Sequence, residues 1–472
     1  MNRSFDLVIL GGGAGGFASV IKAEELGAKT LMVNAGLPIG GTCVNVGCVP
    51  TKRLLYMAEV LQLEKNKKFD GIEMGIRKFD FSKVIQSELE LVERMREEKY
   101  VKVIESLKNV KFIEGYATFI SKNEIKVNGE IYKGKKFIIA TGSRTTIPPI
   151  EGIKETGFIT HIEALKIKEL PKELLIIGAG PLGLEFAQMF SRFGSKVTVL
   201  ELLPSIFMPG EREIVKRLER ILSDEGITIK TNVRVKRAFK EGDKKVLEYS
   251  FLEGRQEIVE RVSGDEILLA TGRIPNTDGL NLDVTDVKVD KRKAIIVNEF
   301  LQTTNENIYA AGDVINLPLR LETTAGREGT IAAENALTNS EKSIDYDLVP
   351  YTIFTDPELS GIGLTEERLM EKIGRCSCRT VNFSNVPKAI IRERTEGMIK
   401  MVVHPDTKQV LGVHILSPNA SEIIAQAMLI VKNNMTVHDI IETLPIFPSF
   451  SEAIKLCALS FISDISKLSC CV

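Results

Sequence analysis

The sequence predicts an α/β protein with two Rossmann-like dinucleotide-binding domains and a C-terminal α+β domain. Three observations predict this fold. Two glycine-rich turns, each between an apolar run and a helical stretch, lie in register 167 residues apart. The length of 472 residues suits about three domains, at roughly 100 to 200 residues each. From about Tyr346 onward, the pattern changes to strands followed by helices.

The first unit begins with the apolar run 5–10, which indicates a buried parallel strand. Gly11, Gly13 and Gly16 follow this run directly. A helical stretch from about residue 14 ends at Gly27, and the run 30–33 supplies the second strand. Together these segments predict a βαβ unit.

The second unit repeats this pattern. The apolar run 174–177 is followed by glycines, by a helical stretch and by a strand at 196–200. The repeated glycines lie 167 positions after their counterparts, and they are Gly178, Gly180, Gly183 and Gly194. The same offset relates Glu201 to Asn34, the residues that end the two second strands. Five equal offsets predict a duplicated unit.

A glycine-rich turn between a strand and a helix suits the pyrophosphate of a dinucleotide. Glycine permits the tight turn, and the amides and dipole at the helix N-terminus stabilise the negative charge. One such turn is weak evidence, whereas two in-register copies predict two dinucleotide sites. Further candidates for these sites follow later apolar runs, and they are Thr141, Gly142, Gly272, Arg273, Gly312 and Asp313.

The composition is that of an ordinary globular protein. With 44% hydrophobic residues, 26% charged residues and a formal net charge of -1, it indicates no nucleic-acid or membrane partner. Apolar runs fall well short of the roughly 20 residues that span a bilayer. The chain enters its first strand at Phe5 without a basic leader. We therefore expect a cytoplasmic protein.

Two cysteines lie five positions apart just after the first unit. Gly41 and Thr42 precede Cys43, and Lys52 follows Cys48. A helix starting here would place both thiols near its N-terminus, where the helix dipole and the lysine favour the reactive thiolate. The alternative, a pair of buried free cysteines, suits this glycine-flanked, polar setting poorly. The pair is therefore predicted to be redox-active.

With these motifs, the whole chain resembles the pyridine nucleotide-disulfide oxidoreductases, the group of glutathione reductase and lipoamide dehydrogenase. The resemblance implies FAD at the first turn, NADH or NADPH at the second, and Cys43 with Cys48 as the active disulfide. It also implies that Lys52 pairs with Glu185 beside the flavin and that Asp313 contacts the flavin's ribityl chain. The implied cofactor-binding residues are Gly11, Gly13, Gly16, Asn34, Gly41, Thr42, Lys52, Thr141, Gly142, Gly178, Gly180, Gly183, Glu201, Gly272, Arg273, Gly312 and Asp313.

The same resemblance implies a homodimer whose active sites draw residues from both subunits. The FAD domain, the NAD(P)H domain and the dimerisation domain are expected at residues 1–148 with 274–345, at 149–273 and at 346–472. Within the last domain we expect strands at 398–403 and 409–413, and helices near 421–432 and 451–460.

Disulfide-reducing members of the family carry a histidine five residues before a glutamate, and the pair moves protons to and from the thiols. Here Phe447 occupies the histidine position, while Glu452 is present. Losing such a proton-transfer group costs about 10² to 10⁴ in rate, which disfavours glutathione or dihydrolipoamide as the substrate.

The chain ends in Cys470 and Cys471, two adjacent cysteines near the terminus. Thiolates prefer soft metal ions, so this pair is predicted to capture one and pass it to Cys43 and Cys48. An inert tail is the alternative. The missing histidine and the Cys-Cys end together resemble the mercuric reductases within the family. This resemblance implies reduction of Hg(II) to Hg(0), with the metal delivered by the tail of the partner subunit.

Some features leave alternatives open. Glu201 would repel the 2′-phosphate of NADPH and favours NADH, whereas the mercuric reductases favour NADPH. Asn34 stands where an acidic residue commonly holds a ribose hydroxyl, and Ser449 stands where those enzymes commonly have tyrosine. A dihydrolipoamide dehydrogenase-like or thioredoxin reductase-like disulfide reductase, and a flavoprotein that binds soft metals without turnover, are the competing functions.

The remaining cysteines are expected to have other roles. Cys376 and Cys378 form a C-x-C motif that can bind metal, although a structural or incidental role is favoured because no second pair lies nearby. Cys457 is expected in the core of a helix.

Overall fold

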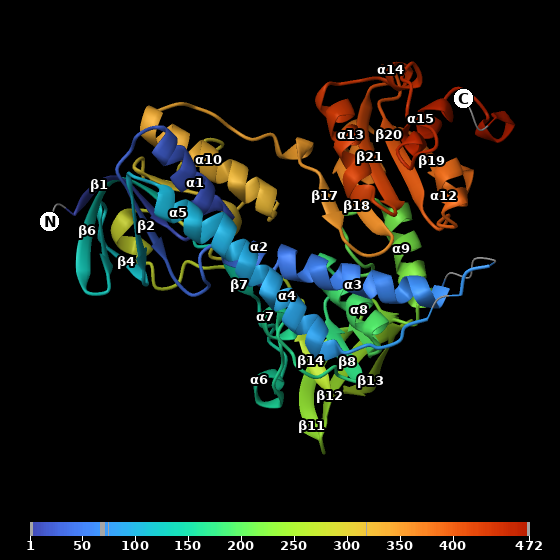
Figure 1. The fold of residues 1–472 in the computed structure, drawn as a ribbon, viewed down its shortest axis with the longest axis horizontal. Helices are drawn as coiled ribbons and strands as arrows, with labels where there is room; N and C mark the ends of the chain where they lie inside the picture. The colour runs from blue at the N-terminus through green and yellow to red at the C-terminus, as the bar shows by residue number, and fades with distance from the viewer. Residues whose placement is uncertain (1–2, 67–70, 74, 318, 470–472) are drawn as a thin grey trace.

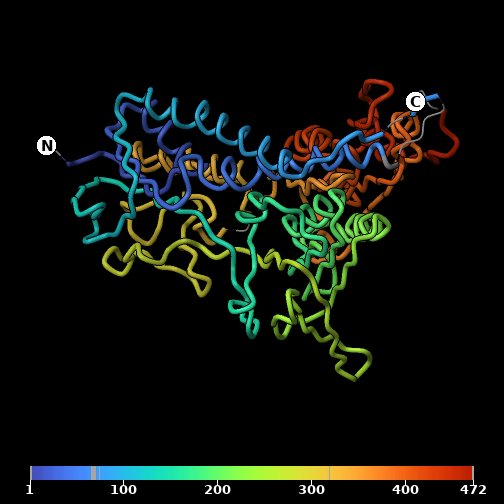
Figure 2. The backbone as a smooth tube through the Cα atoms, turned by 60° about the horizontal axis from the view of Figure 1, so that its bottom comes forward, coloured from blue at the N-terminus to red at the C-terminus, as the bar shows by residue number. Residues whose placement is uncertain are grey.

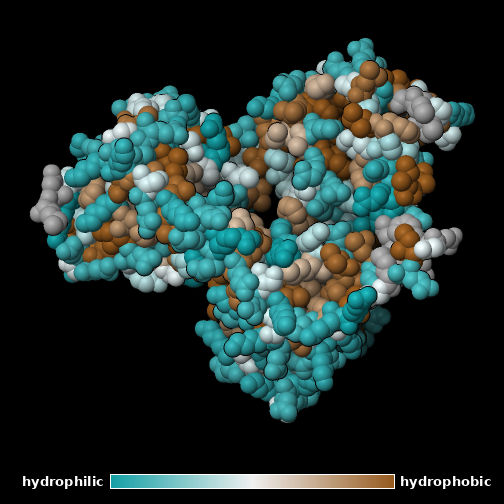
Figure 3. Space-filling view, in the orientation of Figure 1, coloured by the Kyte–Doolittle hydropathy of each residue, from teal (hydrophilic) through white to brown (hydrophobic). Residues whose placement is uncertain are grey.

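The computed structural model describes residues 3–66, 71–73, 75–317 and 319–469, and Figure 1 shows their arrangement. Three lobes surround a central hollow in the space-filling view (Figure 3). The chain begins and ends at opposite sides of the molecule (Figure 2). Among the described residues, none of the helices combines the length and apolar character needed to cross a membrane.

The first lobe is built on a seven-stranded sheet. Its path runs β3-β2-β1-β6-β5-β4, and β16 pairs with the end of β6. The strands are β1 (Ser4–Leu10), β2 (Thr30–Asn34), β3 (Val110–Glu114), β4 (Ala117–Ser121), β5 (Glu124–Val127), β6 (Glu130–Ile139) and β16 (Ile308–Ala310). The pairs among β3, β2, β1, β6 and β16 are parallel, while β4, β5 and β6 pair antiparallel.

Two helices cross tightly over this sheet. They are α1 (Ala14–Glu25) and α10 (Glu322–Thr338). A Cβ on Gly329 would lie only 1.9 Å from the carbonyl oxygen of Gly15, so the crossing requires glycine. The Ser19 hydroxyl donates to the carbonyls of both glycines, at 2.8 and 2.9 Å. This contact joins segments more than 300 residues apart and holds the first glycine-rich turn against α10.

The second lobe repeats the parallel arrangement on a smaller scale. Its sheet has the order β10-β9-β8-β14, all parallel. The strands are β8 (Glu173–Ile177), β9 (Lys196–Leu200), β10 (Thr228–Lys230) and β14 (Glu266–Leu269), with helices α8 (Pro181–Phe193) and α9 (Arg212–Asp224). An antiparallel sheet extends this lobe, and it comprises β11 (Arg234–Glu241), β12 (Lys244–Glu253) and β13 (Gln256–Gly264).

Both predicted βαβ units are confirmed. The expected strands at 5–10, 30–33, 174–177 and 196–200 fall within β1, β2, β8 and β9. Gly27 and Gly194 adopt φ of 71° and 118°, the left-handed conformation that suits the end of a helix.

A short antiparallel ladder carries the chain between these lobes. It pairs β7 (Ser143–Thr145) with β15 (Arg273–Pro275). Further small helices flank the crossing, and they are α6 (Ile153–Thr156), α7 (His161–Ala164) and the 3-10 turn at Gly312–Val314.

The third lobe contains a five-stranded antiparallel sheet in the order β17-β18-β21-β20-β19. Its strands are β17 (Tyr351–Ile353), β18 (Glu358–Gly363), β19 (Ser377–Asn382), β20 (Met398–Val403) and β21 (Val410–Ser417). Its helices are α11 (Glu366–Ile373), α12 (Pro387–Ile391), α13 (Ala420–Lys432), α14 (Val437–Ile441) and α15 (Glu452–Leu459). The expected α+β pattern is confirmed, and β21 continues beyond the expected end at residue 413.

One hydrophobic core crosses from lobe to lobe. Leu54 of the first lobe, Phe186 of the second and Leu416 of the third belong to the same buried cluster. Because burying a large apolar side chain contributes about 1.5 to 3 kcal/mol, a shared core fixes the lobes against one another. The thiol-bearing segment runs through this junction.

Candidate active site

The predicted thiols lie on two consecutive helices. Cys43 is in the short helix α2 (Gly41–Val46), and Cys48 is the first residue of α3 (Cys48–Asn66). The prediction of a single helix is wrong, because the helical conformation is interrupted at Gly47. A Cβ there would lie 2.9 Å from the carbonyl oxygen of Thr42. The break places Cys48 at the positive end of a 19-residue helix, where the dipole stabilises its thiolate.

The two thiols influence each other's ionisation. Both are free, with Cys43 half-buried and Cys48 exposed. A hydrogen bond with Cys43 is the main cause that lowers the pKa of Cys48 to about 7, and the charge of Lys52 lowers it further. The same hydrogen bond raises the pKa of Cys43 above its ordinary value. Cys48 is therefore the thiolate near neutral pH, and Cys43 holds the proton.

The loop before α2 is held by a side chain that the sequence did not single out. The Asn45 amide donates to the carbonyls of Pro38, Ile39 and Gly41 at 3.0, 3.1 and 2.8 Å. Its oxygen accepts from Arg96 at 3.1 Å. Asn45 therefore uses its whole amide to hold the segment that carries Cys43.

This loop also touches the first glycine-rich turn. The Gly40 amide donates to the carbonyl of Gly12 at 2.8 Å. Gly41 has a φ of 61°, and a Cβ there would lie 2.6 Å from the Cα of Gly13. The thiol helix is thus packed backbone to backbone against the turn that is predicted to bind FAD.

An ion pair joins the thiol helix to the second lobe. Lys52 of α3 donates from Nζ to both carboxylate oxygens of Glu185 of α8, at 2.8 and 3.0 Å. The Glu185 side chain is only 6% exposed, and it also accepts the backbone amide of Phe354 at 2.9 Å. The Lys52 ammonium lies 4.5 Å from the centre of the Phe354 ring. The predicted Lys52–Glu185 pairing is confirmed, with a third partner from the C-terminal lobe.

The two glycine-rich turns have matching contacts. Gly11 and Gly178 adopt φ of 118° and 106°, and a Cβ on either would strike the carbonyl oxygen of the alanine that directly follows β6 or β14. A Cβ on Gly16 or Gly183 would lie 1.9 or 2.0 Å from the carbonyl oxygen of Gly11 or Gly178. The first and last glycines of each turn are therefore required by backbone packing.

Asn34 and Glu201 also occupy equivalent positions. Asn34 Oδ1 accepts the amide of Gly12 at 3.1 Å, and Glu201 Oε2 accepts the amide of Ala179 at 2.6 Å. The other oxygen of Glu201 accepts from Leu203 at 2.8 Å. Both side chains are buried. Asn34 therefore accepts a backbone amide of the first glycine-rich turn, just as Glu201 does in the second.

The middle glycines differ in their surroundings. A Cβ on Gly180 would meet no atom within 4 Å, whereas one on Gly13 would meet only Gly41, at 3.7 Å. Each turn therefore presents helix N-terminal amides without a side chain in the way, as a bound pyrophosphate requires. The residues at each of the two turns therefore fit a bound dinucleotide.

Asp313 lies in a polar cluster at the end of β16. It accepts a hydrogen bond of 2.5 Å from the Ser143 hydroxyl, and the Arg273 guanidinium lies 3.4 Å away. Arg273 also donates to the hydroxyl and carbonyl of Ser143, both at 2.6 Å. Gly312, with a φ of 78°, donates its amide to Glu328 at 2.6 Å. Asp313 and Arg273 are thus brought together, and Ser143 is a member that spacing alone did not reveal.

The two Ala-Thr-Gly motifs hold the crossing between the lobes. The Thr141 hydroxyl donates to the carbonyl of Asn276 at 2.7 Å, and the Thr271 hydroxyl donates to that of Thr146 at 2.6 Å. The carbonyls of Gly142 and Gly272 accept amides from the opposite strand at 2.9 Å. These hydrogen bonds stabilise the β7–β15 ladder. The two Ala-Thr-Gly motifs are therefore alike because each makes the same contacts where the chain passes between the lobes.

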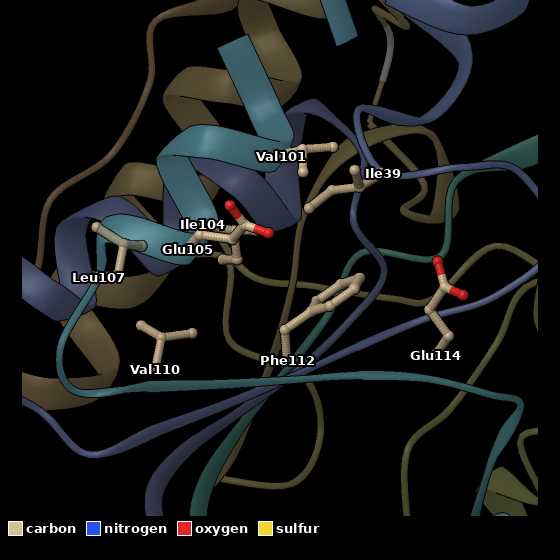
Figure 4. A pocket seen from close by; sticks show the side chains of 8 residues that line it. All are labelled: Ile39, Val101, Ile104, Glu105, Leu107, Val110, Phe112 and Glu114. Atoms are coloured by element: carbon tan, nitrogen blue, oxygen red, sulfur yellow. The ribbon is translucent and has the colours of Figure 1, made fainter. Parts of the chain in front are cut away.

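Two pockets lie near the segment that carries Cys43, Cys48 and Lys52. One of about 370 Å³ lies between β3 and the helical segment before it, where apolar side chains such as Ile39, Ile104 and Phe112 line it (Figure 4). The other, of about 520 Å³, is lined by Lys52, Gln188, Phe354 and residues of the third lobe. The second pocket thus opens where all three lobes meet beside Lys52.

Phe447 stands at the position where disulfide-reducing members of the family have the proton-transferring histidine. Phe447 is 48% exposed, and the Ser449 hydroxyl lies 3.0 Å from that of Ser451. Glu452 is 3% exposed, and among the described residues its Oε2 has no hydrogen-bond partner. Burial raises the pKa of this carboxyl. Cys470 and Cys471 lie outside the described residues, whereas Cys457 is fully buried as expected.

Sequence reasoning missed Asn45, Ser143 and Phe354. Each acts through a partner at least 100 residues away or through backbone carbonyls. The only local signal was the position of Asn45 between the two cysteines.

Comparison with known proteins places these features in context. The chain matches the family described as pyridine nucleotide-disulphide oxidoreductase over residues 5–351, and that family's dimerisation domain over residues 349–458. A mercuric reductase of Lysinibacillus sphaericus is 39% identical over 99% of this chain and 84% of its own. The mitochondrial dihydrolipoyl dehydrogenase of Pisum sativum is 35% identical over 96% of this chain and 91% of its own.

A solved structure with the same fold is the Cu(II) complex of the HOCl-induced flavoprotein disulfide reductase RclA from Escherichia coli. It superposes with a TM-score of 0.87 at 29% identity, covering 98% of this chain and all of that one.

Proposed function

Because this chain belongs to the pyridine nucleotide-disulphide oxidoreductase family, we propose that it is a mercuric reductase. It would reduce Hg(II) to Hg(0) with electrons from NADH or NADPH, through FAD, at Cys43 and Cys48. The observation that carries the proposal is Phe447 at the position where a disulfide reductase needs a histidine, five residues before a buried Glu452 whose Oε2 has no hydrogen-bond partner among the described residues. The 39% identity to a mercuric reductase supports it.

The chain's residues suit a thiophilic metal better than a disulfide. Cys48, whose pKa is lowered to about 7 by its hydrogen bond with Cys43, offers a thiolate ligand near neutral pH. Cys43 loses its proton when the ion takes the place of the hydrogen bond between the thiols. A reduced disulfide must receive protons, whereas Hg(0) leaves as a neutral atom. The missing histidine is therefore no obstacle to this reaction.

The electrons and atoms balance without a protein proton donor. When bound, FAD would accept a hydride from the nicotinamide and supply its electron pair to the thiol-bound metal. NAD(P)H loses a hydride, Hg(II) gains two electrons, and one proton is released. Lys52 keeps a positive charge close to the thiolate, and Glu185 and Phe354 hold that ammonium in place.

The dinucleotide at the second turn is proposed to be NADH. Both carboxylate oxygens of Glu201 accept backbone amides, which fixes a buried negative charge at the end of β9. This charge disfavours the 2′-phosphate of NADPH.

The active form is proposed to be a homodimer, as the match to a dimerisation domain supports. Leu444 and Ile446 are 93% and 79% exposed on the same loop as Phe447, and this loop is proposed to bury them against the partner. Cys470 and Cys471 of the partner subunit are proposed to deliver Hg(II) to Cys43 and Cys48.

A disulfide reductase is the second candidate, because a dihydrolipoyl dehydrogenase is 35% identical over nearly the whole chain. One assay distinguishes the mercuric reductase from the disulfide reductase. Anaerobic NADH oxidation is measured with Hg(II) and excess thiol while mercury vapour is collected, and oxidised lipoamide, oxidised glutathione and Cu(II) are run in parallel. We expect volatile mercury with Hg(II) and slow turnover of both disulfides.

The matched variants are Cys43→Ser with Cys48→Ser, and Cys376→Ser with Cys378→Ser as a control that also removes two thiols. The first pair should abolish mercury release, and the second should leave it unchanged. Rapid lipoamide reduction without volatile mercury would establish the second candidate. Tight Hg(II) binding without NADH oxidation would indicate sequestration.

A further inference from the structure

A second thiol pair lies far from Cys43 and Cys48 in the sequence, in the C-terminal lobe. Cys378 is in the edge strand β19, and Cys376 is two residues earlier. Cys376 lies just before the strand, and its Sγ atom is 3.1 Å from that of Cys378. Cys376 Sγ also lies 3.4 Å from Oε1 of Glu366, the first residue of α11. The ligand atoms of all three residues lie within 4.8 Å of one another.

The carboxylate of this group is already oriented. Glu366 Oε2 accepts a hydrogen bond of 2.6 Å from Lys400 Nζ, and Lys400 also pairs with the buried Glu211 at 2.8 Å. Lys400 thereby holds one oxygen of Glu366 and leaves the other facing the thiols. Metal-binding carboxylates are commonly held by such a second partner.

The group is also separate and accessible. Cys376, Cys378 and Glu366 are all half-buried, so an ion can reach them. Cys457 is fully buried and donates to the carbonyl of Arg379, and it is not among the described residues whose ligand atoms cluster here.

The spacing is close to that of a tetrahedral site. With metal–sulfur bonds of about 2.3 Å, two thiolates on one tetrahedral ion lie about 3.8 Å apart. A carboxylate oxygen bound at about 2.1 Å lies about 3.6 Å from each sulfur. The observed 3.1 and 3.4 Å need to open by less than about 1 Å, which small side-chain rotations supply.

We propose that Cys376, Cys378 and Glu366 form a binding site for one thiophilic divalent ion of the Zn(II) class, with water as the fourth ligand. Two thiolates and a carboxylate carry three negative charges, and the ammonium of Lys400 together with the ion balances them. The site is independent of the reaction at Cys43 and Cys48.

Co(II) is a suitable probe, because tetrahedral thiolate ligation gives strong absorption in the red, beyond the absorption of oxidised flavin. The test uses the full-length, FAD-loaded protein with Cys43, Cys48, Cys470 and Cys471 changed to Ser, kept reduced and anaerobic. We expect one tetrahedral Co(II) per chain, displaced by an equimolar amount of Zn(II). Adding Cys376→Ser and Cys378→Ser should abolish this spectrum.

Glu366→Gln should weaken Co(II) binding by about 10- to 100-fold. Glu367→Gln, its exposed neighbour on α11, serves as the matched control and should bind as the parent does. Flavin content and melting temperature show whether each variant is folded. The proposal is overturned if the parent gives only a weak octahedral spectrum, or if the spectrum survives loss of both cysteines. Equal binding by Glu366→Gln and Glu367→Gln would remove Glu366 from the site.

Discussion

Gly41 lies so close to Gly13 that a Cβ on Gly41 would be 2.6 Å from the Cα of Gly13. The thiol helix and the first glycine-rich turn therefore form one backbone contact, with no side chain between them. Packing of this kind ties the position of Cys43 to the position of the predicted FAD site. It also makes the contact sensitive to a single methyl group.

Gly41→Ala should therefore lower both stability and flavin content. The left-handed conformation costs alanine about 1 to 2 kcal/mol, and the clash adds about 1 to 3 kcal/mol. Gly129→Ala is the control, because Gly129 has a φ of 85° but open space around it. Thermal unfolding and the flavin-to-protein absorbance ratio measure the effect. Equal losses in the two variants would show that the contact with Gly13 is unimportant.

Cys43→Ala should raise the pKa of Cys48. The hydrogen bond from Cys43 is the main cause that lowers this pKa to about 7, so its loss moves the value toward the ordinary 9.0. The pH profile of Cys48 alkylation in the reduced enzyme, followed by mass spectrometry, gives the apparent pKa. Cys43→Ser keeps a hydroxyl donor and should show a smaller rise, whereas Cys376→Ala should show none. An unchanged profile in Cys43→Ala would contradict the assigned hydrogen bond.

The enzyme should use NADH with a higher kcat/KM than NADPH. Glu201→Gln removes the negative charge but keeps an oxygen for one of the two amides, so it should narrow this preference. Glu253→Gln, at an exposed position of the same lobe, should leave the ratio of the two kcat/KM values unchanged. A native preference for NADPH would show that Glu201 does not select the dinucleotide.

Phe447→His should introduce disulfide reductase activity. The buried Glu452 then gains the partner that its free oxygen lacks, and general acid–base catalysis contributes about 10² to 10⁴ in rate. Turnover of oxidised lipoamide by Phe447→His is compared with that of Phe447→Leu. Adding Glu452→Gln to Phe447→His should remove most of the gain. No gain with histidine would show that the position does not govern substrate choice.

Charges on the exposed loop of the C-terminal lobe should dissociate the dimer. Leu444→Asp with Ile446→Asp introduces two buried charges into the proposed interface, and light scattering after size-exclusion chromatography should then report a monomer. Leu252→Asp, on an exposed strand of the second lobe, is the control and should remain dimeric. A native chain that is already monomeric would contradict the homodimer.

The duplicated units were predictable because their signals are local. A strand, a tight turn and a helix occupy consecutive residues, and the required glycines follow from backbone geometry at that point. The strand expected at 398–403 coincides with β20 for a related reason, since it is a buried run in which every residue except Lys400 is apolar.

The thiol segment was less predictable because long-range contacts shape it. Nothing in the spacing of Cys43 and Cys48 shows that the helix breaks at Gly47, where a Cβ would lie 2.9 Å from the carbonyl oxygen of Thr42. The third partner of the Lys52–Glu185 pair, Phe354, lies 169 residues beyond Glu185. Such contacts depend on the packing of whole lobes, which local patterns do not encode.

The two glycine-rich turns are two copies of one structural unit within one polypeptide, so the tolerance of the two copies to substitution can be compared. Substitutions at the first or last glycine should be selected against equally in both copies, because a structurally equivalent carbonyl oxygen would clash with the added Cβ in each copy. The middle position is different, since only Gly13 has a neighbouring helix behind it while Gly180 faces open space. A side chain at Gly180 would therefore be opposed by the bound pyrophosphate rather than by protein packing, and the thiols could be acquired beside one copy without disturbing the dinucleotide held by the other.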